Sequence, residues 1–405
     1  MSLVANVGIL TLHYGFNEGA ILQAYGVTQL VHEHLPGSSA RIIDQRYPGK
    51  LRAYGPANND RKRALLDAID HWLPLSEQRF RTENTEMVLR YVQETFDLVV
   101  MGSDVIWNLR YRPRFSRLFS GGLGYTQTNP FFPAFPNVYW PGDTVRVPKV
   151  AYAASVGTLT WSTIPSRHRR QMRKILTSFT AISVRDERTH RFLDWLDPAL
   201  ADRAVLVPDP TLGVSLLNPA RVASVRAFLK ERGVDFDRPR CGIICGPHAQ
   251  LEAAMTKLRK RGYQIIGITT PNTYSDIPLF DQPFHPLDWA VLFQLMDVCV
   301  VDRMHGSIFC IQNHAPFVAL DSYETEQDND SKTRSLMRRF GLTDFCVSKA
   351  RVTAGELLER IKALEQGAVE WGRIDKELEQ CRQDAGAFFQ TFAESMEMLP
   401  VGRTK

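Results

Sequence analysis

Short apolar runs rich in Val and Ile alternate along the chain with longer segments whose apolar residues recur at helical spacing. Several runs are apolar throughout, which is typical of strands that helices cover on both faces. The alternation therefore predicts βα units, parallel sheets and an α/β fold class. The predicted strands are residues 6–12, 40–44, 98–102, 150–154, 181–184, 205–207, 241–245, 264–268, 298–302 and 317–320.

A change in the pattern of apolar residues divides the chain into two main parts. Prolines interrupt the pattern within residues 208–219, and a new helix and strand begin after them. We expect an N-terminal domain at residues 1–213 and a second domain at 214–370, which suits a chain of 405 residues. Within the remaining segment 371–405, residues 374–398 carry an apolar stripe, so this segment is predicted to be helical and to pack across the body.

Residues 109–148 depart from the pattern and predict a long structured loop. They hold nine aromatic residues, five arginines and six prolines, with neither a helical nor a strand period. Loops of this length are often functional, and aromatic rings can stack on sugar rings while arginines bind acidic groups. Two interpretations stay open: the insertion shapes the site of a sugar acceptor, or it packs its aromatic rings on the edge of the sheet.

Composition narrows the class of protein further. Hydrophobic residues make up 44% and charged residues 23%, which excludes disordered and collagen-like chains. The net charge of +5 is too small for a nucleic-acid footprint, and the basic runs at 167–170 and 257–261 lack interleaved aromatic residues. No run reaches the roughly 18 apolar residues of a transmembrane segment, and the first residues do not resemble a signal peptide, so we expect a cytoplasmic protein.

The six cysteines give little sign of a metal site or a disulfide framework. They are scattered and form no CxxC pair. Cys241 and Cys245, with His248 nearby, are conceivable metal ligands, but both cysteines lie in an apolar run where cysteine usually behaves as a small buried hydrophobe. We therefore predict neither a metal nor another cofactor.

Ligands of parallel α/β sheets bind at the carboxyl ends of strands, so polar residues directly after predicted strands are candidates. After the first strand come His13, Asn17 and Gly19, followed by a helix whose first amides suit a carboxylate or phosphate. No Gly-Lys-Ser/Thr follows, so this turn is not a Walker loop.

A second turn follows residues 98–102 and holds Ser103, Asp104 and Trp107, which place a hydroxyl, a carboxylate and an indole together. These residues either bind a ligand or, in the case of Ser103 and Asp104, only cap the next helix. Both alternatives stay open from this segment alone.

Arg185 follows another predicted strand, where its planar guanidinium could bind a carboxylate or phosphate. The competing interpretation is an ion pair with the neighbouring Asp186 or Glu187.

The fourth turn holds Arg303, His305, Gly306 and Ser307 between an apolar strand and an apolar helix. An extended backbone would turn Arg303 and His305 toward the same side. Ser307 and the amides after Gly306 would add an anion site at the helix start. A fixed cation, a proton-transfer group and backbone donors around one point favour catalysis.

Five segments, four of which contain the turns described above, occur in an order that resembles the polysaccharide pyruvyl transferase family. The similarity extends over about residues 6–342 and includes DPT at 209–211 and FGL at 340–342. The segments are NEGAILQAY at 17–25, GSDVIWN at 102–108, AYAASVG at 151–157, SVRDE at 183–187 and DRMHG at 302–306.

The resemblance implies two Rossmann-like domains with parallel sheets facing a cleft, as in GT-B glycosyltransferases. It implies pyruvyl transfer from phosphoenolpyruvate to hydroxyls of a sugar or glycan acceptor, which could be lipid-linked. Arg185, Arg303 and His305 fall on family positions associated with donor binding and proton transfer. The chain departs from the family at Glu18, where tyrosine is usual, and in the longer insertion 109–148.

The residue types suit this chemistry by themselves. Two arginines and helix amides can bind the carboxylate and the phosphate of phosphoenolpyruvate. His305 could donate or accept protons near neutral pH. The alternatives are a GT-B glycosyltransferase with a nucleotide-sugar donor and a nonenzymatic anion- or glycan-binding protein. The identity of the acceptor, the choice between ketal and enol-ether products, and formation of a homo-oligomer stay open.

Overall fold

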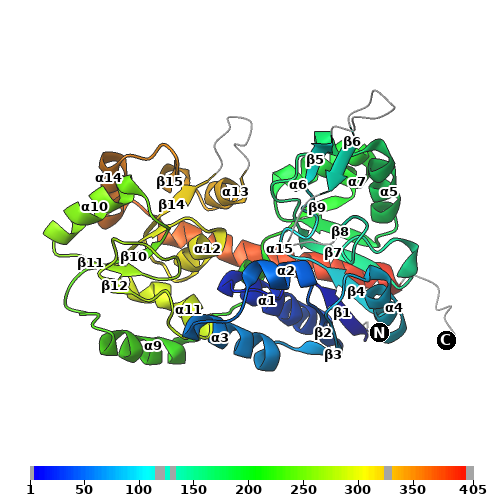
Figure 1. The fold of residues 1–405 in the computed structure, drawn as a ribbon, viewed down its shortest axis with the longest axis horizontal. Helices are drawn as coiled ribbons and strands as arrows, with labels where there is room; N and C mark the ends of the chain where they lie inside the picture. The colour runs from blue at the N-terminus through cyan, green and yellow to red at the C-terminus, as the bar shows by residue number, and fades with distance from the viewer. Residues whose placement is uncertain (1–3, 115–123, 128–133, 323–330, 398–405) are drawn as a thin grey trace. The chain divides into compact units, whose positions relative to one another are not determined.

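The computed structural model describes residues 4–114, 124–127, 134–322 and 331–397. Its contacts divide the chain into two compact units. The first comprises the described residues of Met1–Pro56, Ile69–Val214 and Cys381–Lys405, and the second those of Ala57–Ala68 and Ser215–Gln380. Each unit is built on a parallel sheet against which helices pack, so the predicted α/β class is confirmed (Figure 1).

The first unit has a seven-stranded sheet in the order β3-β2-β1-β4-β7-β8-β9, with all neighbouring strands parallel. The strands are β1 (Asn6–Leu10), β2 (Ser39–Gln45), β3 (Leu75–Phe80), β4 (Leu98–Met101), β7 (Lys149–Ala154), β8 (Ala181–Val184) and β9 (Ala204–Leu206). The helices are α1 (Glu18–His34), α2 (Pro48–Tyr54), α4 (Thr85–Thr95), α5 (Ser166–Thr177), α6 (Glu187–Leu196), α7 (Pro198–Asp202) and α8 (Pro210–Gly213), with short turns η2 (Gly142–Thr144) and η3 (Trp161–Thr163).

The second unit has a six-stranded sheet in the order β12-β11-β10-β13-β14-β15, again with parallel neighbours. The strands are β10 (Arg240–Ile244), β11 (Gln264–Gly267), β12 (Ile277–Pro278), β13 (Val298–Val301), β14 (Phe317–Asp321) and β15 (Cys346–Ser348). The helices are α3 (Asp60–Asp67), α9 (Pro219–Glu231), α10 (Ala249–Lys260), α11 (Pro286–Leu292), α12 (Met304–Gln312), α13 (Lys332–Arg339) and α14 (Ala354–Glu365), with turns η4 (Phe293–Leu295) and η6 (Thr343–Phe345).

Two helical segments contribute residues to both units. The π-helical η1 (Ala68–Trp72) begins in the second unit and continues in the first. The long α15 (Trp371–Glu397) confirms the predicted C-terminal helix and belongs to the second unit up to Gln380. In the first unit, Phe389 of α15 packs against the ring of Tyr152, with 5.2 Å between the ring centroids.

The ten predicted strands are confirmed, because each coincides with a strand of one of the two sheets. Their apolar runs occupy the sheet interiors; every residue of β4 and β13, for example, is buried. The pattern did not predict β3, β12 and β15, which lie at sheet edges. β3 has exposed polar residues in its middle, so it lacks the apolar run that identified the central strands.

The insertion 109–148 contains two short strands, whereas the sequence predicted a long structured loop throughout. β5 (Tyr111–Arg114) pairs antiparallel with β6 (Gly124–Gln127). Such short strands are fixed by their pairing and carry no recognisable alternation of their own. Residues 115–123 and 128–133, with four of the nine aromatic residues, lie outside the described part of the chain.

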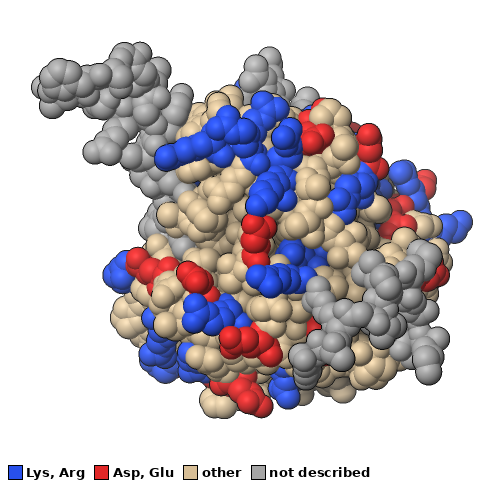
Figure 2. Space-filling view, turned by 90° about the vertical axis from the view of Figure 1, so that its right-hand side faces the viewer, with Lys and Arg blue, Asp and Glu red and all other residues tan. Residues whose placement is uncertain are grey.

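The two basic runs lie on helices, as the sequence predicts. On α5, the Arg169 guanidinium lies 4.3 Å from the centre of the Trp195 ring; on α10, Arg259 contacts Asp276 at 2.6 Å. The face in Figure 2 carries Lys and Arg side chains gathered in its upper half, with Asp and Glu beside and below them. Within the described ranges, no helix combines the length and apolar character required to cross a membrane.

Candidate functional site

At the carboxyl ends of β4 and β8 in the first unit, a buried arginine holds two carboxylates together. Arg185, whose side chain is 2% exposed, donates to Asp104 Oδ1 at 3.1 Å and to Asp209 Oδ2 at 2.8 Å. The sequence indicated an internal ion pair as the alternative to ligand binding, and an ion pair is present. Its partners are distant along the chain, whereas the neighbouring Asp186 caps α6 by accepting from the Thr189 amide.

The turn after β4 is fixed by its backbone and by buried contacts. Gly102 has φ of +125°, and a Cβ placed there would lie 2.0 Å from the Tyr152 carbonyl oxygen, so glycine is required. The buried Ser103 donates to Gln23 at 2.9 Å. Asp104 adopts φ of +73°, a left-handed conformation that is uncommon outside glycine. This backbone directs Asp104 toward Arg185.

Trp107, a predicted ligand-binding residue, belongs to the hydrophobic core of the first unit. Its side chain is fully buried, and its ring lies 5.6 Å from that of Trp140. Phe135 and Tyr139 of the insertion are buried in the same core, as is Tyr111. These aromatic residues therefore pack internally, and for Tyr111, Phe135 and Tyr139 this agrees with the interpretation in which the insertion packs its aromatic rings on the sheet.

His13 is buried after β1 and interacts with a network of ion pairs. Its Nε2 lies 3.2 Å from Asp44 Oδ1, and Asp44 also accepts from Arg46 at 2.7 Å and Arg79 at 2.6 Å. Burial lowers the pKa of His13 despite the opposing effect of Asp44. Burial disfavours the charge of Asp44, but its contacts with His13 and Arg46 outweigh this effect and hold its pKa well below the usual range.

Asn17 and Gly19 form the start of α1. The Asn17 side chain accepts from the Gly19 amide at 3.1 Å, as an N-cap residue does. The structure thus gives these two predicted ligand-binding residues a local structural role.

Lys50 is a partly buried residue of α2 in the same unit, and the sequence analysis did not single it out. Its Nζ lies 5.7 Å from the centre of the Tyr54 ring. Its charge interacts with those of Asp104 and His13. Burial lowers the pKa of Lys50 to about 8, although Asp104 acts in the opposite direction.

In the second unit, Arg303 directly follows β13 and forms the N-cap position of α12. Its side chain is exposed, and its guanidinium makes a long contact of 3.5 Å with the Thr270 hydroxyl. Because this guanidinium is exposed, it is available to bind an anion. The amide hydrogens at the start of the helix carry partial positive charge and favour an anion at the same place.

His305, Gly306 and Ser307 lie in the first turns of α12 and are buried. The expectation that Arg303 and His305 extend to the same side along a strand is wrong, because the helix already begins at Met304 and only Arg303 has an extended backbone. His305 is consequently 8% exposed, while Arg303 is exposed. The Ser307 amide bonds to the Arg303 carbonyl at 3.1 Å, so the amides of residues 304–306 are the ones directed out of the helix.

Asp302 and Lys349 add an ion pair beside this turn, with 2.8 Å between Oδ2 and Nζ. Cys245 lies beside this pair, where burial raises the pKa of its thiol to about 11 and Asp302 and Lys349 act on it as well. Cys241 is buried with its sulfur 3.9 Å from that of Met255. His248 caps α10 and contacts the Lys349 carbonyl at 2.9 Å. Among the described residues, no group of three or more His, Cys, Asp and Glu side chains is arranged to hold a metal.

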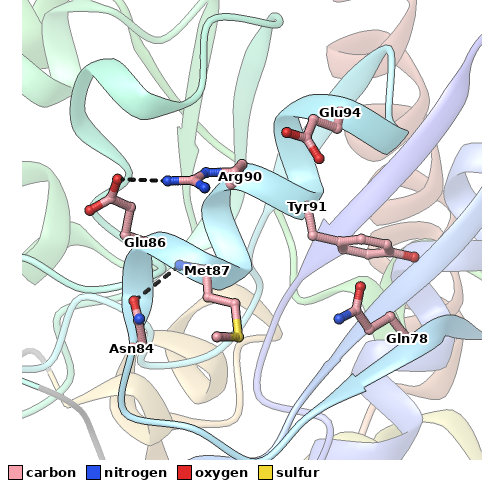
Figure 3. Close-up of a pocket in the computed structure, with 7 residues that line it drawn as sticks. All are labelled: Gln78, Asn84, Glu86, Met87, Arg90, Tyr91 and Glu94. Atoms are coloured by element: carbon pink, nitrogen blue, oxygen red, sulfur yellow. Dashed lines mark hydrogen bonds and ion pairs between the residues drawn. The ribbon is translucent and has the colours of Figure 1, made fainter.

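A cavity of about 330 Å³ lies between β3 and α4, and none of the residues discussed above lines it. Figure 3 shows Arg90 and Glu86 paired at its rim, 3.3 Å apart, with Tyr91 directed toward Gln78. Its remaining lining residues are Asn84, Met87 and Glu94. Exposed ion pairs of this kind are common on helix surfaces, so the cavity provides no functional argument.

Sequence reasoning thus identified residues around both carboxyl edges but missed Lys50, Asp44 and the role of Asp209. Asp209 lies in the DPT segment, so a signal for it was present in the sequence. Lys50 had none, because a lysine in a short helix has no distinguishing pattern.

Comparison with known proteins gives a family and a fold. The family model described as polysaccharide pyruvyl transferase matches residues 17–323. This range contains the two ion-paired carboxylates, their arginine and the whole first turn of α12. No curated protein matches the sequence.

Solved structures resemble the chain along most of its length. UDP-GlcNAc 2-epimerase from Neisseria meningitidis is 10% identical with a TM-score of 0.54, over 96% of this chain and 99% of that chain. The epimerase from Methanocaldococcus jannaschii is 9% identical with a TM-score of 0.55, over 98% and 99%. HepE from Anabaena, solved with UDP, is 10% identical with a TM-score of 0.52, over 97% and 100%. At such low identity these similarities show a shared fold of the GT-B-like kind.

Proposed function

The chain belongs to the polysaccharide pyruvyl transferase family, and on this premise we propose that it moves a pyruvyl group from phosphoenolpyruvate to hydroxyls of a sugar or glycan acceptor. The observation that carries the proposal is the start of α12, where an exposed Arg303 stands beside outward-directed helix amides and His305. A cytoplasmic location, as the sequence predicts, is part of the proposal.

Arg303 would bind the anionic donor. Phosphoenolpyruvate carries a carboxylate and a phosphate, and a guanidinium can bind either with two parallel hydrogen bonds. The amides of residues 304–306 would receive the other oxygens. The long contact to Thr270 costs little to break, so Arg303 can turn toward a ligand.

His305 would give a proton to the methylene carbon of the donor. Protonation turns that carbon into a methyl group and leaves an electron-poor C2, which an acceptor hydroxyl attacks. The C–O bond to phosphate then breaks, and a second hydroxyl closes the ketal. The two acceptor hydroxyls lose one proton each. One of these protons replaces the proton that His305 gave to the methylene carbon, and the other leaves on phosphate. General acid catalysis of this kind is typically worth ~10²–10⁴ in rate.

Arg185 has a different role in this proposal from the direct donor contact that the resemblance implies. Its guanidinium is already engaged by Asp104 and Asp209 and is almost completely buried. We therefore assign it as a positioning residue that fixes Asp104. Asp104, itself partly exposed, would accept a hydrogen bond from an acceptor hydroxyl.

Donor binding tests the proposal against its main alternative, a glycosyltransferase that uses a nucleotide sugar. Calorimetric titration with phosphoenolpyruvate, UDP-glucose and UDP-GlcNAc would be run on the wild type and on Arg303→Met. We expect the wild type to bind phosphoenolpyruvate and the variant to lose at least tenfold in affinity, about 1.4 kcal/mol. Binding of a UDP-sugar without binding of phosphoenolpyruvate would favour the glycosyltransferase.

A further inference from the structure

The first unit carries a basic surface that has no role in the proposed reaction. We infer that this surface attaches the protein to an anionic lipid bilayer. The inference goes beyond the proposed function and does not depend on it, because attachment to a bilayer requires no catalysis. We call this surface the α5 surface; it consists of Arg167, Arg169, Arg170, Arg173 and Lys174 of α5 with the adjoining Arg203, Val205 and Leu206.

The charge of α5 is the first argument. Its sequence, SRHRRQMRKILT, contains four arginines, one lysine and no acidic residue. All five cations are exposed, whereas Met172, Ile175 and Leu176 are buried. α5 lies on the right in Figure 1, and Figure 2 looks at that side and shows Lys and Arg side chains gathered in its upper half. The helix therefore turns an apolar side inward and a basic side to solvent.

The second argument is that much of this charge has no countercharge. Arg167 and Arg170 make no hydrogen bond or ion pair with any residue that the structure describes. The Arg169 guanidinium lies 4.3 Å from the centre of the Trp195 ring, a contact that leaves its charge in place. Lys174 does contact a carboxylate, that of Asp143, at 2.6 Å.

The basic run of α10 in the second unit is different in this respect. Arg259 contacts Asp276 at 2.6 Å, and Arg261 contacts Glu365. Carboxylates thus neutralise two cations of that run, which makes α10 a suitable internal control for α5.

Exposed apolar side chains adjoin the cations of α5, which is the third argument. Arg203 donates to the carbonyl of Thr177, the last residue of α5, at 3.4 Å, so the chain around Arg203 lies beside the end of this helix. Val205 and Leu206 of the edge strand β9 follow and are 51% and 48% exposed. They are two of the four large apolar side chains that are exposed in the described part of the chain. Cations beside exposed apolar groups are typical of surfaces that bind membranes peripherally.

A bilayer fits this surface better than a nucleic acid does. Anionic headgroups attract lysine and arginine within a Debye length, about 10 Å at 0.1 M salt. Val205 and Leu206 could enter the boundary between headgroups and acyl chains, whereas a phosphate backbone offers them no apolar partner. Binding of single strands also uses aromatic rings on which bases stack, and α5 contains no Phe, Tyr or Trp.

Vesicle flotation of the full chain tests the inference. The vesicles contain phosphatidylcholine alone or with about 30% phosphatidylglycerol, so that only the second kind is anionic. We expect the wild type to float with the anionic vesicles at low salt, to be released by about 0.5 M NaCl, and not to bind phosphatidylcholine.

Two charge-reversal variants locate the binding surface. Arg167→Glu combined with Arg170→Glu should lower the partition coefficient by ~20-fold or more, because both cations lose their attraction to the headgroups. Lys257→Glu combined with Lys260→Glu makes the same change in charge at exposed positions of α10 and should stay within about threefold of the wild type. All four side chains are exposed, so the melting temperatures should not change.

A third variant tests the apolar part of the surface. Val205→Ser combined with Leu206→Ser should weaken binding to anionic vesicles severalfold without changing the charge. Absence of wild-type binding to anionic vesicles, or equal losses in the α5 and α10 variants, would overturn the inference. A wild type that binds a fluorescent RNA oligonucleotide but not the vesicles would overturn it in favour of a nucleic-acid surface.

Discussion

Arg303 is a residue whose geometry matters as much as its charge. Because its side chain is exposed at the N-cap of α12, Arg303→Lys should leave the melting temperature unchanged. A lysine lacks the planar fork, so we expect the dissociation constant for phosphoenolpyruvate to rise about tenfold or more. Arg351→Lys, at an exposed arginine of the same unit, is the control. Unchanged donor affinity in Arg303→Lys would remove this residue from the site.

His305 is buried, so its replacement must keep its volume and hydrogen bonding. His305→Gln should lower kcat by ~10²-fold or more, because glutamine cannot transfer a proton, and should change the donor dissociation constant by less than about threefold. Single-turnover kinetics and calorimetry on the folded variant would separate the two quantities. A rise in the dissociation constant with unchanged kcat would assign His305 to binding instead.

Burial of His13 should make the free energy of unfolding depend on pH. Its pKa lies below 6.5 in the folded chain, so the unfolded chain binds more protons as the pH falls below 6.5. The free energy of unfolding should therefore fall from pH 7 to pH 5, and less steeply in His13→Gln. Burial also lowers the pKa of His168 and His285, so part of the slope should remain. Urea denaturation at each pH measures this, and an identical slope in the variant would contradict the account.

For single residues, the sequence predicted the position along the fold better than the local geometry. The DRMHG segment identified Arg303 and His305 correctly as neighbours of a helix start, but residue spacing cannot reveal that the helix begins at Met304 and buries the histidine. The competing interpretation of Arg185 was an ion pair with Asp186 or Glu187, whereas the carboxylates that it binds, Asp104 and Asp209, lie 81 and 24 residues away along the chain.

At the scale of elements, Arg185 ties together the turn after β4, the end of β8 and the start of α8. Arg185→Met leaves Asp104 and the buried Asp209 without their countercharge, so the free energy of unfolding should fall by ~3–5 kcal/mol. Adding Asp104→Asn and Asp209→Asn should recover part of this loss, because no uncompensated charge then remains. Wild-type stability of Arg185→Met combined with lost donor binding would show a direct donor contact.

Strands could be predicted from the sequence where all their residues are buried, but not where buried and exposed residues are mixed. The apolar runs of central strands such as β4 and β13 are read directly from the sequence, since both faces meet helices. The edge strand β3 exposes three consecutive residues and has no such run. The insertion 109–148 gave a composition without a period, and its buried aromatic residues join a core that only the tertiary structure defines.

At the scale of the whole molecule, the alternation of strands and helices predicted two α/β sheets, and both are present. The pattern could not assign residues 57–68 to the second unit, because an amphipathic helix does not specify which core its apolar face joins. The fold is shared with proteins that bind UDP-sugars, so the chemistry depends on the residues at the strand ends and not on the architecture.

We propose that this chain transfers a pyruvyl group and that Arg303 is needed for the transfer. The direct measurement is incubation of the wild type and of Arg303→Met with phosphoenolpyruvate and a library of glycan acceptors, with phosphate release and product mass followed together. We expect the wild type to release phosphate in step with an acceptor mass gain matching a pyruvyl group, and Arg303→Met to do so at least tenfold more slowly. Phosphate release without a pyruvylated acceptor, or equal rates in both proteins, would contradict it.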